Sequence, residues 1–326
     1  MIISRTPMRM SFVGGGSDLP VFYRKYGGAV ISTAIDRYVY ITVNQKFDER
    51  IRVSYSRTED VRNIERIRHP LVRESLKLVG INGGVEITCI ADIPSKGSGL
   101  GSSSSFTVGL LNALHAFASR HAGAEQLASE ACTVEMERCG DPIGKQDQYA
   151  AAFGGLNFVR FNPDDTVVVE PIICRRETIQ EFQAHTVVFY TGITRSASDI
   201  LKHQSSALAT QKRKCDVTRR MVELAHTLLR ELQQNRLSSV GEIIHEGWLL
   251  KKGLTRGITT DRIDEWYNKA RRAGATGGKL LGAGAGGFLM FYAAPEKHEA
   301  IESSLKLRRV DFRFEPQGSR IIFVHV

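Results

Sequence analysis

The chain contains the run Pro94-Ser95-Lys96-Gly97-Ser98-Gly99-Leu100-Gly101-Ser102-Ser103-Ser104-Ser105. It follows a stretch typical of a strand (residues 84–91) and precedes an amphipathic helix that we expect to begin near Ser102. Glycines let the backbone turn tightly and approach a ligand. The first turn of a helix presents N–H groups without helical partners and the positive end of the helix dipole. This order of strand, loop and helix therefore predicts a phosphate-binding junction.

The run differs from two other glycine-rich patterns. It is not a Walker A loop, because no Gly-Lys-Ser or Gly-Lys-Thr sequence ends it. A flexible Gly/Ser linker is the alternative interpretation. The position of the run between an expected strand and an expected helix favours the phosphate site over the linker.

The composition is that of an ordinary globular protein. With 326 residues, 42% of them hydrophobic and 24% charged, the chain is long enough for two domains with separate cores. The five cysteines show neither a Cys-x-x-Cys pair nor metal-ligand spacing, which predicts reduced thiols. The first residues lack the apolar core of a signal peptide, and no apolar run is long enough for a membrane span. We therefore expect a cytoplasmic protein with no membrane partner.

The charge balance favours anionic ligands. Lys and Arg number 44 and Asp and Glu number 35, so the net charge is +9. Such an excess suits nucleotides, sugar phosphates or nucleic acid. The densest basic groups, residues 212–214 and 219–220, fall inside a long helical pattern and are interpreted as a solvated helix face. Because no aromatic side chains are interleaved with these charges, we do not expect a nucleic-acid partner.

Strand and helix signals mix irregularly along the chain. Strands are expected at residues 2–13, 29–43, 51–55, 84–91, 156–161, 166–172, 185–190 and 287–292, with two more at the C-terminus. Helices are expected at residues 70–79, from 102 to about 117, at 124–138, 197–234, 240–251 and 261–273, and from 295. This mixture predicts an α+β fold rather than a doubly wound sheet.

A second element joins a strand to three glycines and an acid. Residues 5–18 read Arg-Thr-Pro-Met-Arg-Met-Ser-Phe-Val-Gly-Gly-Gly-Ser-Asp and end at Asp18. An acid in such a tight loop can accept hydrogen bonds from sugar hydroxyls. The alternative is a plain turn with a solvated aspartate.

A third element carries two further carboxylates. Glu135 lies four residues after Ala131 and eight after Leu127, so it shares the apolar stripe of the helix expected at residues 124–138. A carboxylate on a buried stripe needs a metal ion or a charged partner, and an arginine partner is the alternative to a metal. Asp147 follows a loop shaped by proline and glycine, where a helix N-cap or a surface acid is the alternative to a functional role.

The fourth element is a glycine-rich stretch near the C-terminus. Residues 274–288 contain seven glycines among fifteen residues. Such a loop allows close approach of its backbone to another loop or to a ligand. A simple structural hairpin rarely needs so many glycines.

These elements, in this order, resemble the three motifs of the GHMP kinases, the superfamily of galactokinase, homoserine kinase, mevalonate kinase and phosphomevalonate kinase. The resemblance covers almost the whole chain. It implies a two-domain α+β fold, with an N-terminal ATP-binding domain (residues 1–180) of the ribosomal protein S5 domain 2-like type and a C-terminal α/β-sandwich domain (residues 181–326). It also implies ATP and Mg²⁺ as cofactors, with ATP and substrate bound between the domains.

The resemblance carries roles over to single residues. It implies an ATP-binding loop of Pro94, Lys96, Gly97, Ser98, Gly99, Leu100, Gly101, Ser102, Ser103 and Ser104. It implies Mg²⁺ ligands at Ser103 and Glu135, and catalytic roles for Asp147 as base and Arg9 near the reacting centre. The expected substrate-binding residues are Gly15, Gly16, Ser17, Asp18, Thr191, Gly192, Arg195, Lys279 and Gly284.

Within this superfamily the sequence departs from galactokinase. The first motif reads Gly14-Gly15-Gly16-Ser17-Asp18-Leu19, where galactokinase has Gly-Glu-His-Thr-Asp-Tyr, so galactose is disfavoured. Residues 12–20 and 190–197 instead resemble bacterial D-glycero-D-manno-heptose 7-phosphate kinases. That resemblance implies transfer of a phosphoryl group from Mg·ATP to the anomeric hydroxyl of a sugar phosphate, on the route to nucleotide-activated heptose for surface polysaccharide.

Two other functions stay open at this stage. One is a different kinase of the superfamily, acting on fucose, another sugar or an isoprenoid precursor. The other is a catalytically silent sensor of sugar and nucleotide. The combination of Asp147, Ser103 and Glu135 favours an enzyme, because a sensor needs neither a base nor a metal site. The sequence leaves a homodimer open.

Overall fold

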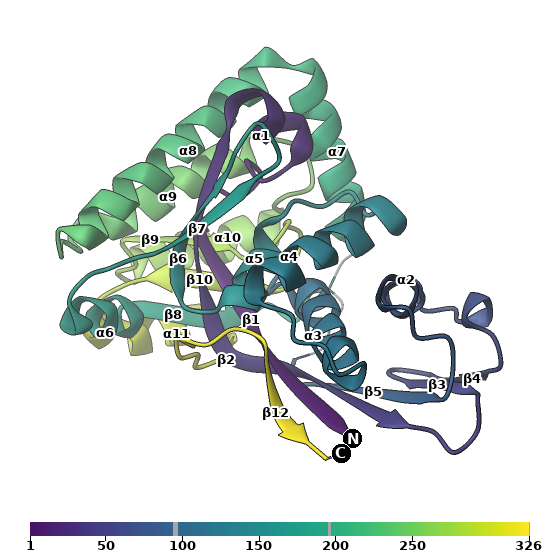
Figure 1. Ribbon diagram of the computed structural model, residues 1–326. Coiled ribbons are helices and arrows are strands. Elements are labelled where there is room, and N and C mark those ends of the chain that lie inside the picture. Colours follow the sequence, from purple (N-terminus) through teal and green to yellow (C-terminus); the bar gives the residue numbers. More distant parts are fainter. Residues whose placement is uncertain (94–96, 195–196, 326) are drawn as a thin grey trace.

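The computed structural model describes residues 1–93, 97–194 and 197–325, which form a mixed α+β fold with two sheets, as predicted (Figure 1). No helix within these ranges is long and apolar enough to cross a membrane. The strands are β1 Ile2–Val13, β2 Gly28–Gln45, β3 Ile51–Ser54, β4 Thr58–Val61, β5 Val85–Ala91, β6 Leu156–Phe161, β7 Val167–Pro171, β8 Thr186–Tyr190, β9 Gly277–Leu280, β10 Phe288–Tyr292, β11 Arg308–Arg309 and β12 Arg320–Val324.

Helices surround both sheets. The α-helices are α1 Pro20–Tyr26, α2 Pro70–Val79, α3 Ser102–Phe117, α4 Ala124–Cys132, α5 Gln146–Phe153, α6 Arg176–Ala184, α7 Ala197–Thr210, α8 Lys212–Gln233, α9 Val240–Lys252, α10 Asp261–Arg272 and α11 His298–Leu305. A π-helix, η2 (Thr133–Arg138), continues α4, and η1 (Ile64–Arg66) and η3 (Pro295–Lys297) are 3-10 turns.

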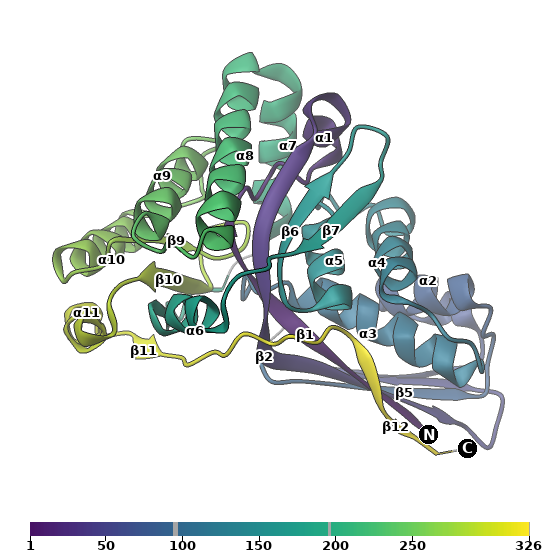
Figure 2. The ribbon, with the colours of Figure 1, turned by 60° about the vertical axis from the view of Figure 1, so that its left-hand side comes forward.

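The larger sheet is organised around one long strand. Its order is β12-β1-β2-β5-β3-β4, and β6 and β7 join it through β2. Residues 28–33 of β2 pair with β6, whereas residues 39–45 pair with β5. The last strand, β12, pairs with β1, so the two termini lie side by side (Figure 2). Residues 320–324 therefore lie in the first sheet, and the division of the chain at residue 180 stays a prediction.

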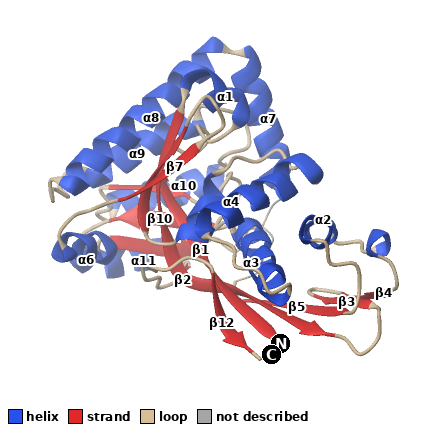
Figure 3. Cartoon of the chain, viewed as in Figure 1, coloured by secondary structure: helices blue, strands red, loops and turns tan. Residues whose placement is uncertain are grey.

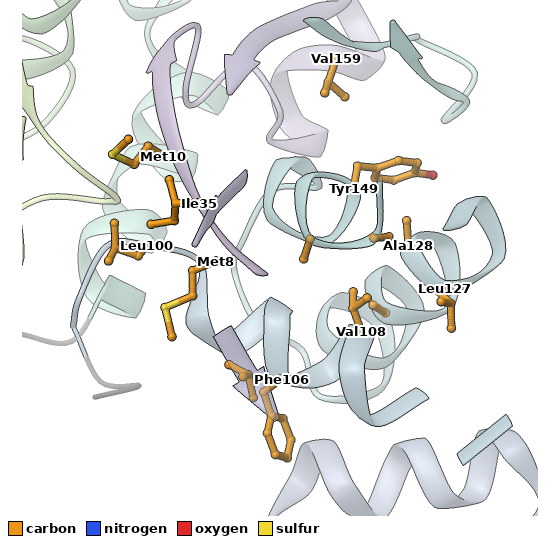
Figure 4. Close-up of a cluster of buried hydrophobic side chains, with 14 of the residues drawn as sticks. Met8, Met10, Ile35, Leu100, Phe106, Val108, Leu127, Ala128, Tyr149 and Val159 are labelled. Carbon is orange, nitrogen blue, oxygen red and sulfur yellow. The ribbon is translucent and has the colours of Figure 1, made fainter. Parts of the chain in front are cut away.

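Helices α3, α4 and α5 form the layer that covers one face of this sheet (Figure 3). Val108 of α3, Leu127 and Ala128 of α4, and Tyr149 of α5 are buried in one apolar cluster (Figure 4). The sequence predicts an amphipathic α3, but this helix is buried on nearly all sides. The reason is that α2, α4, α5 and the sheet enclose it together.

The smaller sheet has the order β11-β8-β10-β9 and lies on the other side of the molecule (Figure 2). Helix α9 packs against β9, and α8 packs against both α9 and β2 of the larger sheet. Trp248 of α9 and Phe189 of β8 belong to the core of this second layer. The long helix α8 thus connects the two parts of the fold.

The expected elements are present, and five were not anticipated: α1, β4, α5, α6 and β9. Strand β9 falls in the stretch that the sequence presents as a glycine-rich loop. Its residues Gly277 and Gly278 have low strand propensity. Pairing with β10 and packing of α9 against Gly277 make it a strand, and both are tertiary contacts.

The two glycine-rich loops meet backbone to backbone. Gly99 and Gly282 adopt φ angles of +74° and +75°, a region that favours glycine. A Cβ atom on Gly282 would overlap the Cα of Gly99, and one on Gly99 would overlap the carbonyl of Leu281. The loop that follows β5 is therefore held directly against the loop that follows β9.

We expect Gly282→Ala to lower the free energy of unfolding by roughly 2–5 kcal/mol, measured by urea denaturation. The left-handed conformation accounts for about 1–2 kcal/mol and the overlap with Gly99 for roughly 1–3 kcal/mol. Gly80→Ala is the matched control, because Gly80 has a φ of +84° but open space around it. Equal losses in the two variants would contradict a tight contact between the loops.

Candidate active site

A cavity of about 240 Å³ lies where the two glycine-rich loops meet the end of β1. Its walls come from β1 and the loop after it, α3 and α5 with the loops before them, α7, α9, β9 and the loop after β9. The lining residues are Arg9, Ser11, Gly15, Gly16, Asp18, Leu19, Gly97, Ser98, Gly99, Gly101, Ser102, Ser103, Ser104, Asp141, Ile143, Gly144, Gln146, Asp147, Leu201, Gln204, Lys251, Lys279, Gly282 and Ala283.

The predicted phosphate loop lies at one end of this cavity. Gly97, Gly99 and Gly101 all have positive φ, and the first residues of α3 line the cavity directly after them. Because the N-terminus of α3 is turned toward the cavity, its dipole favours an anion there. The ordered loop and the adjoining helix N-terminus therefore fit an anion site better than a flexible linker.

Arg9 and Asp147 form the central ion pair of the cavity. Arg9 Nε and Nη2 each donate to one carboxylate oxygen of Asp147 at 2.7 Å, a bidentate arrangement. Arg9 Nη1 donates to the carbonyl of Gly99 at 2.7 Å, and the backbone N–H of Arg9 donates to the carbonyl of Leu100 at 3.0 Å. Strand β1 thus places Arg9 between the phosphate loop and Asp147 at the start of α5.

Asp18 is buried beside this pair. It accepts a hydrogen bond from the Gly16 N–H at 2.8 Å, and Gln146 donates to it from Nε2 at 3.3 Å. Burial, followed by the nearby charge of Asp147, raises the pKa of Asp18. A side chain at Gly144 would overlap the Asp18 carboxylate, so the loop before α5 closes over it. A plain turn with a solvated aspartate is therefore not what the structure has.

Glu135 lies on the π-helix η2, fully buried, whereas Glu137 is exposed. Ser104 Oγ donates to it at 2.8 Å, Thr107 Oγ1 at 3.0 Å and Ser103 Oγ at 3.4 Å, and Gln148 Nε2 also donates. Burial raises the pKa of Glu135 to about 7. No lysine or arginine of the described chain forms an ion pair with it, so the arginine alternative is wrong.

The residues around Glu135 fit a magnesium ion. Carboxylate and hydroxyl oxygens are the hard ligands that Mg²⁺ prefers, and a buried carboxylate held only by neutral groups lacks a compensating cation. Ser103 is exposed at the cavity end of α3, within reach of Glu135. Among the described residues no cluster of three or more His, Cys, Asp or Glu side chains offers another metal site.

Several predicted substrate residues lie elsewhere. Ser17 exchanges hydrogen bonds with the backbone of Ala29, and Thr191 Oγ1 donates to the carbonyl of Gly287 at 2.8 Å. Gly284 packs against Ile258, and Gly192 is exposed. None of these four lines the cavity, and neither does Leu100, which is buried and whose carbonyl accepts from the Arg9 N–H. The predictions for Pro94, Lys96 and Arg195 lie outside the described residues.

Sequence reasoning missed several cavity residues, of which four carry buried polar or charged groups. Ser11, Gln146 and Gln204 each carry a buried polar atom without a partner in the described chain. Lys251 is also buried, and the sequence could have predicted this. It lies seven residues after the buried Ile244, on the apolar stripe of α9. The polar residues had no comparable pattern.

Comparison with known proteins identifies the family. The family model described as GHMP kinases N terminal domain matches residues 65–155, and the one described as GHMP kinases C terminal matches residues 228–308. The D-glycero-alpha-D-manno-heptose 7-phosphate kinase of Campylobacter jejuni is 30% identical over 97% of this chain and 97% of its own length. The chain belongs to the GHMP kinases.

Two solved structures share the fold. A D-glycero-D-manno-heptose 1-phosphate kinase from Bacteriodes thetaiotaomicron superimposes with a TM-score of 0.81 at 25% identity, over 100% of both chains. A putative sugar kinase from Campylobacter jejuni superimposes with a TM-score of 0.79 at 27% identity, over 98% of this chain and 97% of its own. The protein is an ATP-dependent small-molecule kinase of the sugar kinase type, and the alternative of a silent sensor is set aside.

Proposed function

We propose that this kinase transfers the γ-phosphoryl group of ATP to the anomeric hydroxyl of D-glycero-D-manno-heptose 7-phosphate, giving the 1,7-bisphosphate for nucleotide-activated heptose. The observation that carries the chemistry is the Arg9–Asp147 pair, anchored on the Gly99 carbonyl of the phosphate loop. The relative that supports the substrate is the heptose 7-phosphate kinase of Campylobacter jejuni. A cytoplasmic location and a homodimer remain predictions.

In the proposed reaction Asp147 orients the hydroxyl and accepts its proton. The hydroxyl oxygen bonds to the γ-phosphorus as the bond to the bridging oxygen of ADP breaks, and ADP leaves with the bridging electron pair. Arg9 uses three of its five N–H donors, two on Asp147 and one on the Gly99 carbonyl. The two remaining donors favour a second role for Arg9, the stabilisation of negative charge on the transferring phosphoryl group.

Ser103 and Glu135 would hold Mg²⁺, which neutralises charge on the β- and γ-phosphates in this chemistry. Gly97, Gly99 and Gly101 would let the backbone approach the phosphates, and the N-terminus of α3 would add its dipole. The oxygen atoms gathered around Glu135 support the assignment of the metal ligands. The place of the glycine loop in the cavity lining supports the assignment of the phosphate site.

The cavity also favours a polyhydroxylated substrate. Ser11 Oγ, Gln146 Oε1 and Gln204 Nε2 are buried, and none finds a hydrogen-bond partner in the described chain. Buried polar groups are costly unless they are paired, so these atoms call for ligand hydroxyls or ordered water. With the Asp18 carboxylate they supply both donors and acceptors, which is what a sugar needs.

We expect Mg²⁺-dependent ATP consumption with heptose 7-phosphate, produced from sedoheptulose 7-phosphate by its isomerase, and none with mannose, fucose, galactose or mevalonate. The assay is ADP release coupled to NADH oxidation. Turnover of a free sugar, with none of the heptose phosphate, would keep the kinase chemistry and overturn the proposed substrate.

We expect Asp147→Asn to lower kcat by roughly 10²–10⁴-fold, because a general base contributes about that much. ATP affinity, measured by calorimetry, should change less than about twofold, since Asp147 acts on the acceptor hydroxyl in the proposed reaction. Asp165→Asn is the matched control, because Asp165 forms an exposed ion pair with Arg24 at 3.0 Å. A kcat near that of the wild type would refute Asp147 as the base.

We expect Glu135→Gln to raise the Mg²⁺ concentration at half-maximal activity by at least about tenfold, because the anionic member of the two proposed ligands, Ser103 and Glu135, becomes a neutral amide. The variant should stay folded, since glutamine keeps the shape of the side chain. Glu137→Gln, on the same π-helix but exposed, should leave the Mg²⁺ titration unchanged. An unchanged titration in Glu135→Gln would place the metal elsewhere.

A further inference from the structure

Two buried lysines lie in the wall of the cavity that belongs to the smaller sheet. Lys251 comes from α9 and Lys279 from β9, and both are almost inaccessible to solvent, with exposures of 6% and 5%. Lys279 Nζ donates to the carbonyl of Phe12 at 3.1 Å, and Lys251 Nζ donates to the carbonyl of Gly282. An ammonium group has three donors, and the described residues use one on each lysine.

Neither lysine has a carboxylate partner in the described chain. The two acids whose charge acts on Lys251 are already engaged, because Asp147 is held by Arg9 and Asp18 accepts from Gly16 and Gln146. Burial is the main reason that the pKa of Lys251 falls to about 8 and that the pKa of Lys279 falls well below its usual value. Two buried cations without an anion are costly, so the cavity favours an anionic ligand beside them.

The nucleotide end of the cavity has its own groups for phosphate. The glycine loop, the N-terminus of α3 and the Ser103–Glu135 pair all lie there. The lysines come instead from α9 and β9, and the charges that act on Lys251 are those of Arg9, Asp18 and Asp147, the groups of the proposed reacting centre and sugar site. An anion beside the lysines would therefore be one that the acceptor sugar brings with it.

We propose that Lys251 and Lys279 together bind the phosphate group that the sugar substrate already carries, and so select a phosphorylated sugar over a free one. This inference rests on the proposed function, because a substrate without a phosphate would not need the site. The other source of the same chemistry is the γ-phosphate of ATP, which the experiments below distinguish. Two cationic donors match the double negative charge of a phosphate monoester.

The first test uses inorganic phosphate as the probe and does not require the substrate to be known. With the nucleotide site saturated by AMP-PNP and Mg²⁺, phosphate at constant ionic strength should still raise the melting temperature of the wild type. The increase follows from ligand binding to the folded state alone. Phosphate binding that AMP-PNP abolishes would assign the lysines to the γ-phosphate and overturn the proposal.

Lys251→Met and Lys279→Met remove each charge while keeping a long side chain. Each should weaken the apparent affinity for phosphate by at least about tenfold in the presence of AMP-PNP. Lys269→Met is the matched control, because Lys269 is an exposed residue of α10 paired with Glu265 at 2.7 Å. Unchanged affinity in both cavity variants would overturn the proposal.

The second test is kinetic and compares heptose 7-phosphate with the unphosphorylated heptose. Each cavity variant should lower kcat/KM for the phosphorylated sugar by at least about tenfold and change kcat/KM for the free sugar less than about threefold. An equal loss for both sugars would mean that the lysines act on the transferring group, which overturns the proposal.

If a variant does not fold, inhibition of the wild type by inorganic phosphate provides the test. Inorganic phosphate should then inhibit competitively against heptose 7-phosphate and not against ATP, and competition against ATP alone would overturn the proposal. If the wild type turns over no heptose phosphate, the proposed function fails by itself. The titration of phosphate with AMP-PNP bound still decides the role of the lysines.

Discussion

The contact between two glycine loops is the constraint on which the rest of the site depends. Gly99 and Gly282 approach so closely that neither tolerates a Cβ atom. A Cβ atom on Gly287 would likewise overlap the carbonyl oxygen of Ser98. This contact joins the loop after β5 to the loop after β9, and hence the two sheets. The cavity lies beside this contact, and both loops contribute to its lining.

Arg9 links the phosphate loop to Asp147. It is nearly fully buried and donates to Asp147 and to Gly99, so one side chain aligns the start of α5 with the phosphate loop. An arginine suits this position because its planar group donates to a carboxylate in a bidentate way and still reaches a third acceptor. A lysine would hold a single oxygen and leave the orientation of Asp147 open.

Buried charges without ionic partners are the most informative feature of the cavity. Glu135 is surrounded by three hydroxyls and an amide, and Lys251 and Lys279 donate to backbone carbonyls. Folding alone does not favour such charges, since each loses hydration without gaining an opposite charge. Under the proposals made above, ligands complete these interactions, a cation at Glu135 and an anion at the lysines.

Local patterns were sufficient for most of the fold. The bounds of α2 and the starts of β1, β3 and α9 follow from period and from proline, because those elements are dictated by neighbours in sequence. The inward position of Glu135 also followed from its spacing to Leu127 and Ala131. Strand β9 could not be predicted, since its glycines become a strand only through pairing with β10.

The sequence by itself determined the class of the protein, because its glycine-rich motifs occur in a specific order and each depends on local backbone freedom. It also determined which acids were candidates for chemistry. Only the tertiary structure decided that Arg9 holds Asp147, that Thr191 and Gly284 lie away from the cavity, and that Lys251 lines it. These facts depend on contacts between separate elements of the fold, and no local period records which distant side chains a fold brings together.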